Sequence, residues 1–281
     1  MTNIDPELKP GELAPTPGGA YKFDSKEFPY WLVGMLGIIG LMTLLVVFDE
    51  EYREAFERIF PLPMSATEGI ALTFYLTISS FVVATFLGLM IGLARVSRKV
   101  WLRNLAALYT EFIRGIPMVV FLFAIAFFLA PDFAELIGQP SRAIPQAVRG
   151  AAALSLFYAA FIAEVFRAGI QSVPVTQREA AKALGLNDRQ VMRKVVLPQA
   201  VRNMLPALGN DLISLMKDTS LVSVLAVREL TQMARLYSGS TFRFRESFLI
   251  LMVLYVVLTL ILSLLLRWYE KRLAIPGNTE G

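Results

Sequence analysis

The sequence predicts an all-α membrane protein with six transmembrane helices. Of its 281 residues, 56% are hydrophobic and only 18% are charged, whereas an average soluble domain has roughly 25% charged residues. The first two apolar runs, 31–48 and 69–94, contain no charge, and a helix needs about 20 residues to cross a bilayer. A membrane β-barrel is excluded, because its strands are only ~9 to 11 residues long and alternate in polarity.

The first three spans are predicted at 31–48, 69–94 and about 105–130. At 1.5 Å rise per residue the first run covers about 27 Å, close to the ~30 Å thickness of the hydrocarbon core. The third span is uncharged only from Ile116 onward. Each of the three is long enough to cross the membrane once.

The last three spans are predicted at about 150–170, 206–227 and 247–266. The final one has no charge, but the other two carry ionisable side chains inside the apolar run. These are Glu164 and Arg167 in the fourth span, and Asp211, Lys217 and Asp218 in the fifth. Charged residues inside a membrane face the protein interior or a water-filled cavity.

The distribution of Lys and Arg predicts that both termini are cytoplasmic. Cytoplasmic loops carry an excess of basic residues, and the segments 1–30, 95–104, 171–205 and the C-terminal segment contain sixteen, against eight in the alternate segments. Residues 1–30 are rich in Pro and Gly, which predicts a mobile cytoplasmic tail. Residues 273–281 form a C-terminal tail, and 49–68 an external acidic loop. The net charge of +4 thus reflects membrane topology, and no nucleic-acid partner is expected.

The chain contains no Cys and no His. Disulfides, thiolate nucleophiles, Cys/His zinc sites and Ser-His-Asp triads are therefore excluded, and neither a metal site nor a catalytic residue is expected. The sequence also lacks a GxxxxGK[ST] phosphate-binding loop. We therefore expect that the chain does not hydrolyse ATP itself.

The predicted cytoplasmic segment 171–205 has the composition of folded structure. Residues 177–184 are strong helix formers, Gly185 is a natural stop, and Asn187 caps a second helix that runs to about residue 196, before Pro198. The small Ala180 and Ala181, beside Glu179, offer a surface that another protein can approach closely. These residues alone leave two interpretations open, a docking element or merely a folded loop.

The fifth span cannot face lipid on all sides. Asp211, Lys217 and Asp218 together cost about 9 kcal/mol of insertion free energy, while the nine Leu, Ile and Val residues of this span return only about 4 kcal/mol. At 100° per residue these three groups share an arc of about 120° with Asn210 and Ser214. One stripe of the helix must therefore face protein or water.

A second polar stripe is predicted on the fourth span, where Glu164, Arg167 and Gln171 share a face. Two interpretations stay open. The stripes either meet as a buried ion-pair network, or part of them lines the path of a zwitterion. In the second case Glu164 and Asp211 receive an ammonium group, and the donors for a carboxylate are Asn210, Ser214 and Lys217.

Two shorter patterns concern helix packing. Gly88 and Gly92 form a GxxxG spacing in the second span, which lets another helix approach closely. Glu111 and Arg114 are three residues apart at the entrance to the third span and are expected to form a local ion pair.

The segment 171–205 resembles the EAA motif of ABC importer permeases. The matching residues are Glu179, Ala180, Ala181, Gly185, Leu197 and Pro198, with Val195 where isoleucine is usual. The resemblance covers about residues 69–272. The runs GIALTFYLT, YTEFIRGIPM, FIAEVFRAGI and NDLISLMKDTSL look like those of the polar amino acid subfamily.

The resemblance implies a type I ABC importer permease in the bacterial plasma (inner) membrane, with a five-helix core at 69–272. The span at 31–48 is then an extra N-terminal helix. The EAA segment would be the coupling helix on a cytoplasmic ABC ATPase dimer, which hydrolyses ATP with Mg²⁺, while this chain binds no cofactor. The other implied partners are a second permease subunit, identical or paralogous, an extracytoplasmic solute-binding protein and the amino acid.

Two alternatives belong to other classes. An ion-coupled secondary amino acid transporter would use the membrane-embedded charges as proton or ion carriers, but it would not need the folded cytoplasmic segment. An intramembrane hydrolase would have to use Ser214 and Lys217 as a Ser–Lys dyad. The EAA spacing favours the importer permease over both.

Overall fold

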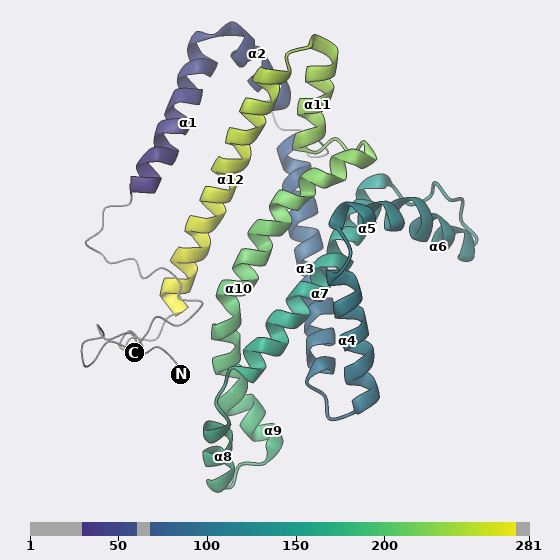
Figure 1. Cartoon of the computed structure of the whole chain (residues 1–281), viewed down its shortest axis with the longest axis vertical. Helices are drawn as coiled ribbons and strands as arrows, with labels where there is room; N and C mark the ends of the chain where they lie inside the picture. The colour runs from purple at the N-terminus through teal and green to yellow at the C-terminus, as the bar shows by residue number, and fades with distance from the viewer. Residues whose placement is uncertain (1–29, 61–67, 274–281) are drawn as a thin grey trace, which may run out of the picture.

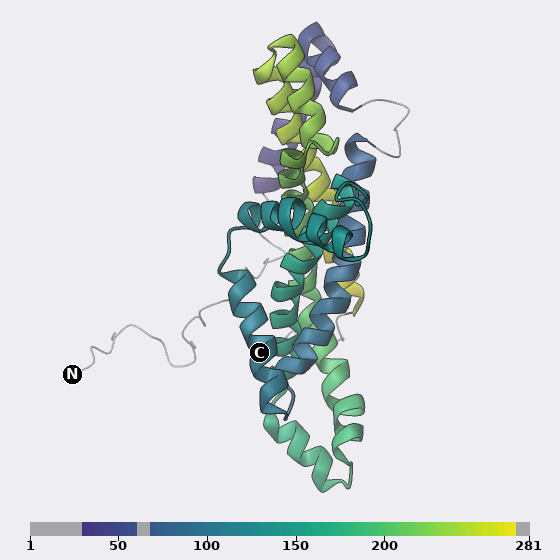
Figure 2. The same ribbon diagram turned by 90° about the vertical axis from the view of Figure 1, so that its right-hand side faces the viewer.

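The described part of the chain, residues 30–60 and 68–273, is helical throughout in this computed structural model. Figures 1 and 2 show an elongated bundle. One end is formed by α2 (Glu50–Ile59) and α11 (Leu230–Thr241), and the other by α8 (Val175–Ala183) and α9 (Asp188–Val191). The predictions for the tails 1–30 and 273–281 fall almost wholly outside the described residues.

Four helical segments in the described ranges are long and apolar enough to cross a membrane. They are α3 (Gly69–Arg95), the run Met118–Leu136, α7 (Gln146–Gln171) and α12 (Phe244–Leu273). The pair of α1 (Tyr30–Phe48) and α2, bent by 105°, is a fifth if the two form one broken span. The predicted class of α-helical membrane protein is therefore confirmed, whereas the count of six spans and the extra N-terminal span remain predictions.

The single helix predicted across 105–130 is wrong. α4 (Val100–Arg114) ends before the turn at Pro117, and α5 (Met118–Ala124) leaves in a different direction (Figure 1). Proline has no N–H to donate, and it disfavours a helical conformation at the residue before it, here Ile116. The apolar run therefore continues across a corner.

Among the described residues, three other prolines lie inside continuous helical runs, and two of them, Pro131 and Pro198, follow a π-helical turn, whereas Pro206 does not. Pro131 follows the π-helical turn η1 (Ile125–Leu129) at the start of α6 (Ala130–Leu136), and Pro198 follows η2 (Met192–Val196) at the start of α10 (Leu197–Asp218). A proline ring clashes with the carbonyl four residues earlier in an α-helix, and the wider π turn relieves that clash. The expectation that the helix ends before Pro198 is therefore wrong.

Part of the predicted acidic loop 49–68 is also helical. The Asp49 side chain accepts a hydrogen bond from the Glu51 backbone N–H at 2.9 Å and starts α2. Tyr52, Ala55 and Ile59, spaced three and four apart, are buried in the cluster that joins α2 to α11 and α12. The sequence predicts a loop here because charged side chains outnumber the three apolar positions of this amphipathic pattern.

The bundle is held together by a close crossing of α3 and α7. A Cβ atom added at Gly88 would lie 2.6 Å from Ile162 Cγ2, and one added at Gly92 would lie 2.9 Å from the Ala163 carbonyl oxygen. Only glycine permits such an approach, because any side chain would push the helices apart. The GxxxG pattern thus lies at the contact with α7.

Glu229 is fully buried and connects the start of α11 to α12. It lies at the start of α11, after the 3₁₀ helix η3 (Thr219–Leu225). Its carboxylate accepts hydrogen bonds from the Gln232 backbone N–H at 2.8 Å and from the Tyr255 hydroxyl of α12 at 3.1 Å. Burial raises the pKa of Glu229 to about 7, although these hydrogen bonds oppose the shift.

This burial predicts a pH-dependent stability. Because the pKa of Glu229 is higher in the folded protein than in the unfolded chain, the folded state binds more protons between about pH 4.5 and pH 7, and stability should fall as the pH rises through this window. In Glu229→Gln that loss, at most about 3 kcal/mol, should disappear. Thermal unfolding of the purified protein at several pH values measures it, with Glu57→Gln on the exposed face of α2 as the matched control. Equal pH slopes in both variants would contradict the role of Glu229.

Candidate functional site

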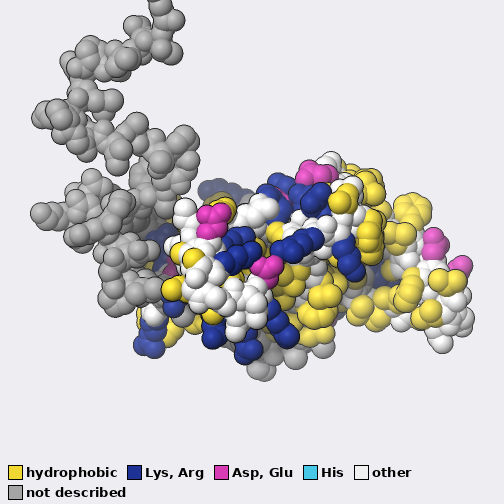
Figure 3. Space-filling model, turned by 90° about the horizontal axis from the view of Figure 1, so that it is seen from below, with side chains coloured by type: hydrophobic (Ala, Val, Ile, Leu, Met, Phe, Trp, Pro, Cys, Tyr) yellow, Lys and Arg dark blue, Asp and Glu magenta, His cyan; other side chains and the backbone are white. Residues whose placement is uncertain are grey.

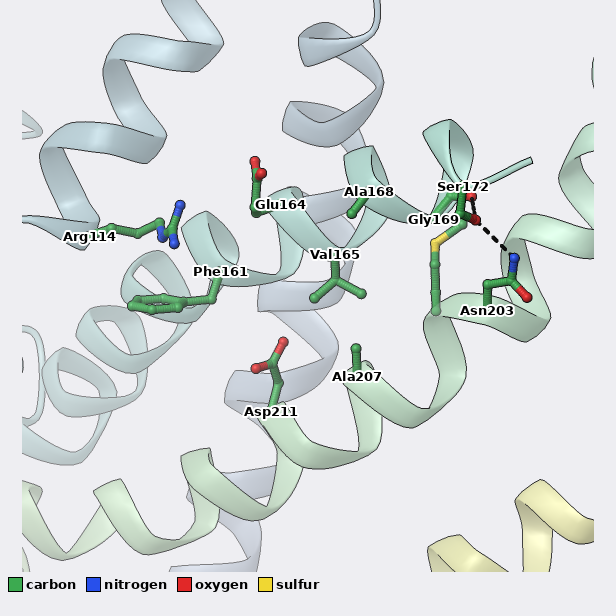
Figure 4. Close-up of a pocket in the computed structure, with 11 residues that line it drawn as sticks. Arg114, Phe161, Glu164, Val165, Ala168, Gly169, Ser172, Asn203, Ala207 and Asp211 are labelled. Atoms are coloured by element: carbon green, nitrogen blue, oxygen red, sulfur yellow. Dashed lines mark hydrogen bonds between the residues drawn. The ribbon is translucent and has the colours of Figure 1, made fainter. Parts of the chain in front are cut away.

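A cavity of about 410 Å³ lies between α7 and α10 (Figure 4). We call it the α7–α10 cavity. α7 contributes most of its wall, α10 contributes the opposite wall, and Arg114 reaches it from the end of α4. Its lining residues are Arg114, Phe161, Glu164, Val165, Ala168, Gly169, Ser172, Asn203, Met204, Ala207 and Asp211.

One end of this cavity is closed where α10 crosses α7. Met204 of α10 packs directly over Gly169, leaving no room for a Cβ atom there. The Asn203 side chain donates a hydrogen bond to the Ser172 hydroxyl at 2.8 Å, shown as a dashed line in Figure 4. Small residues at 168 and 207 leave the space between the helices open.

Glu164 is the more satisfied of the two carboxylates in the cavity. Arg167, one turn along α7, donates from Nε to both Glu164 oxygens at 2.9 Å, and Arg95 of α3 lies 3.5 Å from one of them. Glu111 of α4 is 3.8 Å from the same Arg95. The charge of Glu164 is thus already neutralised by two guanidinium groups.

Asp211 is in the opposite situation. Its Oδ2 atom is buried and has no hydrogen-bond partner within the described ranges, and Figure 4 shows its carboxylate pointing from α10 toward α7. A buried acceptor without a partner costs free energy. The nearest cationic side chain among the lining residues is Arg114, whose guanidinium lies 5.6 Å from the centre of the Phe161 ring. The cavity therefore offers an unused acidic acceptor and a nearby cation.

The structure brings together only part of the predicted polar belt. Glu164 and Asp211 share the cavity, but Asn210, Ser214 and Lys217 lie outside its lining and are exposed in the single chain. One of the two open interpretations was an ion-pair network between the fourth and fifth predicted spans, but among the described residues Glu164 pairs with Arg167 on its own helix and with Arg95 of α3. Asp218 instead accepts a hydrogen bond from the Tyr158 hydroxyl at 2.8 Å.

Two further expectations are corrected within the described residues. Glu111 and Arg114 form no ion pair with each other, because Glu111 faces Arg95 while Arg114 turns toward Phe161. Sequence reasoning consequently missed Arg114 as a cavity residue. Its only signal was its place directly before the corner at Gly115–Pro117, which redirects the chain toward α7.

The second candidate site is the helix–turn–helix of α8 and α9. Gly185 has φ +82°, a conformation that strains any residue with a side chain. Asn187 forms a reciprocal capping box with Gln190, at 3.0 Å in both directions. Ala181 is buried against the end of α7, whereas Leu184 is 84% exposed at the turn. The site therefore presents a rigid turn with an uncovered apolar side chain.

The other four matching residues of the EAA pattern are all exposed. Glu179 and Ala180 are exposed on α8, and Leu197 and Pro198 are exposed at the start of α10. Leu184 was not selected from the sequence, although it directly precedes the glycine.

Asp188 connects this site to the rest of the molecule. It accepts from Lys182 at 2.7 Å and lies 2.8 Å from Arg98, which belongs to the connection between α3 and α4. These two cations lower the pKa of Asp188. All three side chains are more than half exposed, so the contact orients the turn more than it stabilises the fold.

Comparison with known proteins gives consistent matches. The family model of binding-protein-dependent transport system inner membrane components matches residues 84–275. The probable amino-acid permease protein YxeN of Bacillus subtilis (strain 168) is 35% identical over 212 residues, 75% of this chain and 92% of that protein. The glutamine transport system permease protein GlnP of Escherichia coli (strain K12) is 36% identical over 218 residues, 77% of this chain and 96% of that protein.

A solved structure is similar as well. The crystal structure of an amino acid ABC transporter with histidines matches with a TM-score of 0.66 and 36% sequence identity, over 73% of this chain and 92% of that chain. The family match begins inside α3, so α1 and α2 lie outside it.

Proposed function

The chain belongs to the family of binding-protein-dependent transport system inner membrane components and is the permease subunit of an ATP-driven amino-acid importer, and on this premise we propose roles for its two candidate sites. ATP is hydrolysed by a separate subunit. We assign the α8–α9 turn to the contact with that ATPase. We assign the α7–α10 cavity and the exposed stripe of α10 to the amino acid path.

The observation that carries the coupling role is the exposed Leu184 beside the strained Gly185. An apolar side chain that is 84% exposed on a rigid turn is typical of an anchor that a partner buries. Glu179 and Ala180 lie on the same short helix and complete a surface for an ATPase groove. Movement of this turn reaches α3 and α4 through Asp188 and Arg98.

The path is proposed from the chemistry of a zwitterion. The Asp211 carboxylate, which lines the cavity, can accept a hydrogen bond from a substrate ammonium group, and the Arg114 guanidinium can bind a carboxylate. Glu164, held by Arg95 and Arg167, would keep the local charge balanced. The cavity thus has complementary groups for both ends of an amino acid.

A second permease subunit is proposed from the uncovered stripe on α10. Asn210, Ser214 and Lys217 are exposed in the single chain, and if α10 crosses the membrane as the sequence predicts, lipid could not hydrogen-bond them. A second copy or a paralogue packed against this stripe would cover it, and the path would run between the two subunits. Asp218 lies at the end of the same stripe.

We propose that α8 and α9 are cytoplasmic and that α2 and α11 face outward, toward a solute-binding protein. The excess of Lys and Arg at 95–104 and 171–205 supports this orientation, and Figure 1 places α8 and α9 at the end of the bundle opposite α2 and α11. An ion-coupled transporter is a weaker reading, because the family of this chain draws its energy from the ATPase.

The orientation can be tested with single cysteines, since the chain has none of its own. A cysteine at Arg189, exposed on α9, should resist a membrane-impermeant thiol reagent in intact cells, and one at Glu57, exposed on α2, should react. Permeabilised cells should label both. The reverse pattern in intact cells would contradict the proposed topology.

The coupling role predicts the behaviour of Gly185→Val. A β-branched residue at φ +82° costs on the order of 1 to 2 kcal/mol, so the turn should shift while the protein still inserts. Uptake and transport-stimulated ATPase activity of the reconstituted complex should fall at least tenfold.

The chain supplies a matched control for this variant. Gly138 also has positive φ, at +74°, and also has no atom within 4 Å of an added Cβ. Gly138→Val introduces the same strain far from the turn and should leave coupling intact. If both variants transport normally, or both lose activity equally, the α8–α9 turn is only a folded loop.

The path predicts a substrate effect at Asp211. Asp211→Asn removes a charge-assisted hydrogen bond worth roughly 1.5 to 3 kcal/mol, so KM for uptake should rise about 10- to 100-fold while basal ATPase activity persists. Glu164→Gln should instead lower thermal stability, because two guanidinium groups lose their partner. Asp132→Asn, exposed on α6, is the matched control. Wild-type KM and substrate preference in Asp211→Asn would place the path elsewhere.

A further inference from the structure

A second cavity lies at the α8–α9 end of α7. It has a volume of about 270 Å³ and lies between the end of α3, the first part of α4 and α8. We call it the arginine cavity, because Arg95, Arg103 and Arg178 line it from three different helices. Ser97 and Gln171 add two further polar side chains to the lining.

Two of these arginines carry buried donors without an acceptor. The Nε atoms of Arg95 and Arg178 are inaccessible to solvent, and in the part of the chain that the structure describes neither has a hydrogen-bond partner. A buried N–H of a charged group is costly to leave unpaired. Because both Nε atoms are inaccessible, a ligand in this cavity would meet the other guanidinium nitrogens of the three lining arginines.

None of the described residues that line the cavity is acidic. The nearest carboxylates, Glu164 and Glu111, face the terminal nitrogen Nη2 of Arg95, at 3.5 and 3.8 Å, and neither lines the cavity. Arg178 donates from its terminal nitrogen to the Ile170 carbonyl oxygen, which fixes its guanidinium against the end of α7. The lining is therefore cationic and preformed.

We propose that the arginine cavity binds a phosphate group. Guanidinium groups match the geometry of phosphate oxygens and bind them through paired N–H donors, and the Ser97 hydroxyl and Gln171 amide add neutral donors. The inference rests on the orientation proposed above, in which this cavity is on the cytoplasmic side, where basic pockets between membrane helices bind anionic headgroups. Figure 3, which views the α8–α9 end, shows Lys and Arg side chains gathered on this face.

The phosphate can come from an anionic lipid or from free phosphate in the cytoplasm. Trp101, two residues before Arg103, is 65% exposed, and exposed tryptophans mark the level of the membrane interface. Both sources reach that level. Either ligand would link α4 to α8, because Arg103 belongs to α4 and Arg178 to α8.

The test uses the full chain and three variants. Arg103→Gln and Arg178→Gln each remove one guanidinium group from the cavity, and Arg189→Gln removes an exposed arginine of α9 that does not line it. Arg103→Gln disturbs no hydrogen bond to the backbone, so it keeps the test valid if Arg178→Gln folds poorly. Arg95 is left intact because it also holds Glu164.

The lipid arm measures binding of phosphatidylglycerol and phosphatidylcholine to the delipidated protein by native mass spectrometry. If the ligand is a lipid, phosphatidylglycerol should bind preferentially, and each cavity variant should weaken its binding about fivefold. Arg189→Gln should bind as the wild type does.

The free-phosphate arm measures thermal stability in phosphate and in chloride at equal ionic strength. If the ligand is free phosphate, it should stabilise the wild type and Arg189→Gln, but stabilise the cavity variants less. The proposal is overturned if neither ligand binds the wild type selectively, or if Arg189→Gln weakens binding as much as Arg103→Gln does.

Discussion

The close contact of α3 and α7 at Gly88 and Gly92 is the constraint on which the other features depend. With no side chain between the two backbones, α7 lies firmly against α3 along its middle. This contact brings Arg95, at the end of α3, within 3.5 Å of Glu164 on α7. It also leaves other parts of α7 free to line the α7–α10 cavity and the arginine cavity.

Near Pro131 a backbone carbonyl that has no N–H partner within its helix accepts a hydrogen bond from a side chain of α7 instead. In η1 the Ala130 N–H bonds to the Ile125 carbonyl, and Pro131 has no N–H, so the Ala126 carbonyl loses its helical partner. The buried Arg149 of α7 donates to that carbonyl at 2.8 Å. This bond ties the run Met118–Leu136 to α7 at the point where its helix is widened.

The two carboxylates of the α7–α10 cavity, Glu164 and Asp211, differ in their partners. Glu164 is neutralised by Arg95 and Arg167 and so resembles a structural charge. Asp211 has a buried Oδ2 atom with no hydrogen-bond partner within the described residues, so its carboxylate is not neutralised as that of Glu164 is. The arginines differ in the same way. The Nε atoms of Arg95 and Arg178 have no acceptor among the described residues, whereas the guanidinium of Arg149 donates from Nε and from a terminal nitrogen to backbone carbonyls.

The sequence by itself determined the helical membrane class, the helix–turn–helix around Gly185 and the positions of most long helices, because apolar run length, capping residues and glycine are local signals. Only the tertiary structure decided which polar groups share a cavity. Asn210 and Asp211 are neighbours in the chain, yet only Asp211 faces α7. Arg114 and the arginine cavity could not be foreseen, since their partners lie on helices whose crossing angles depend on packing between distant segments.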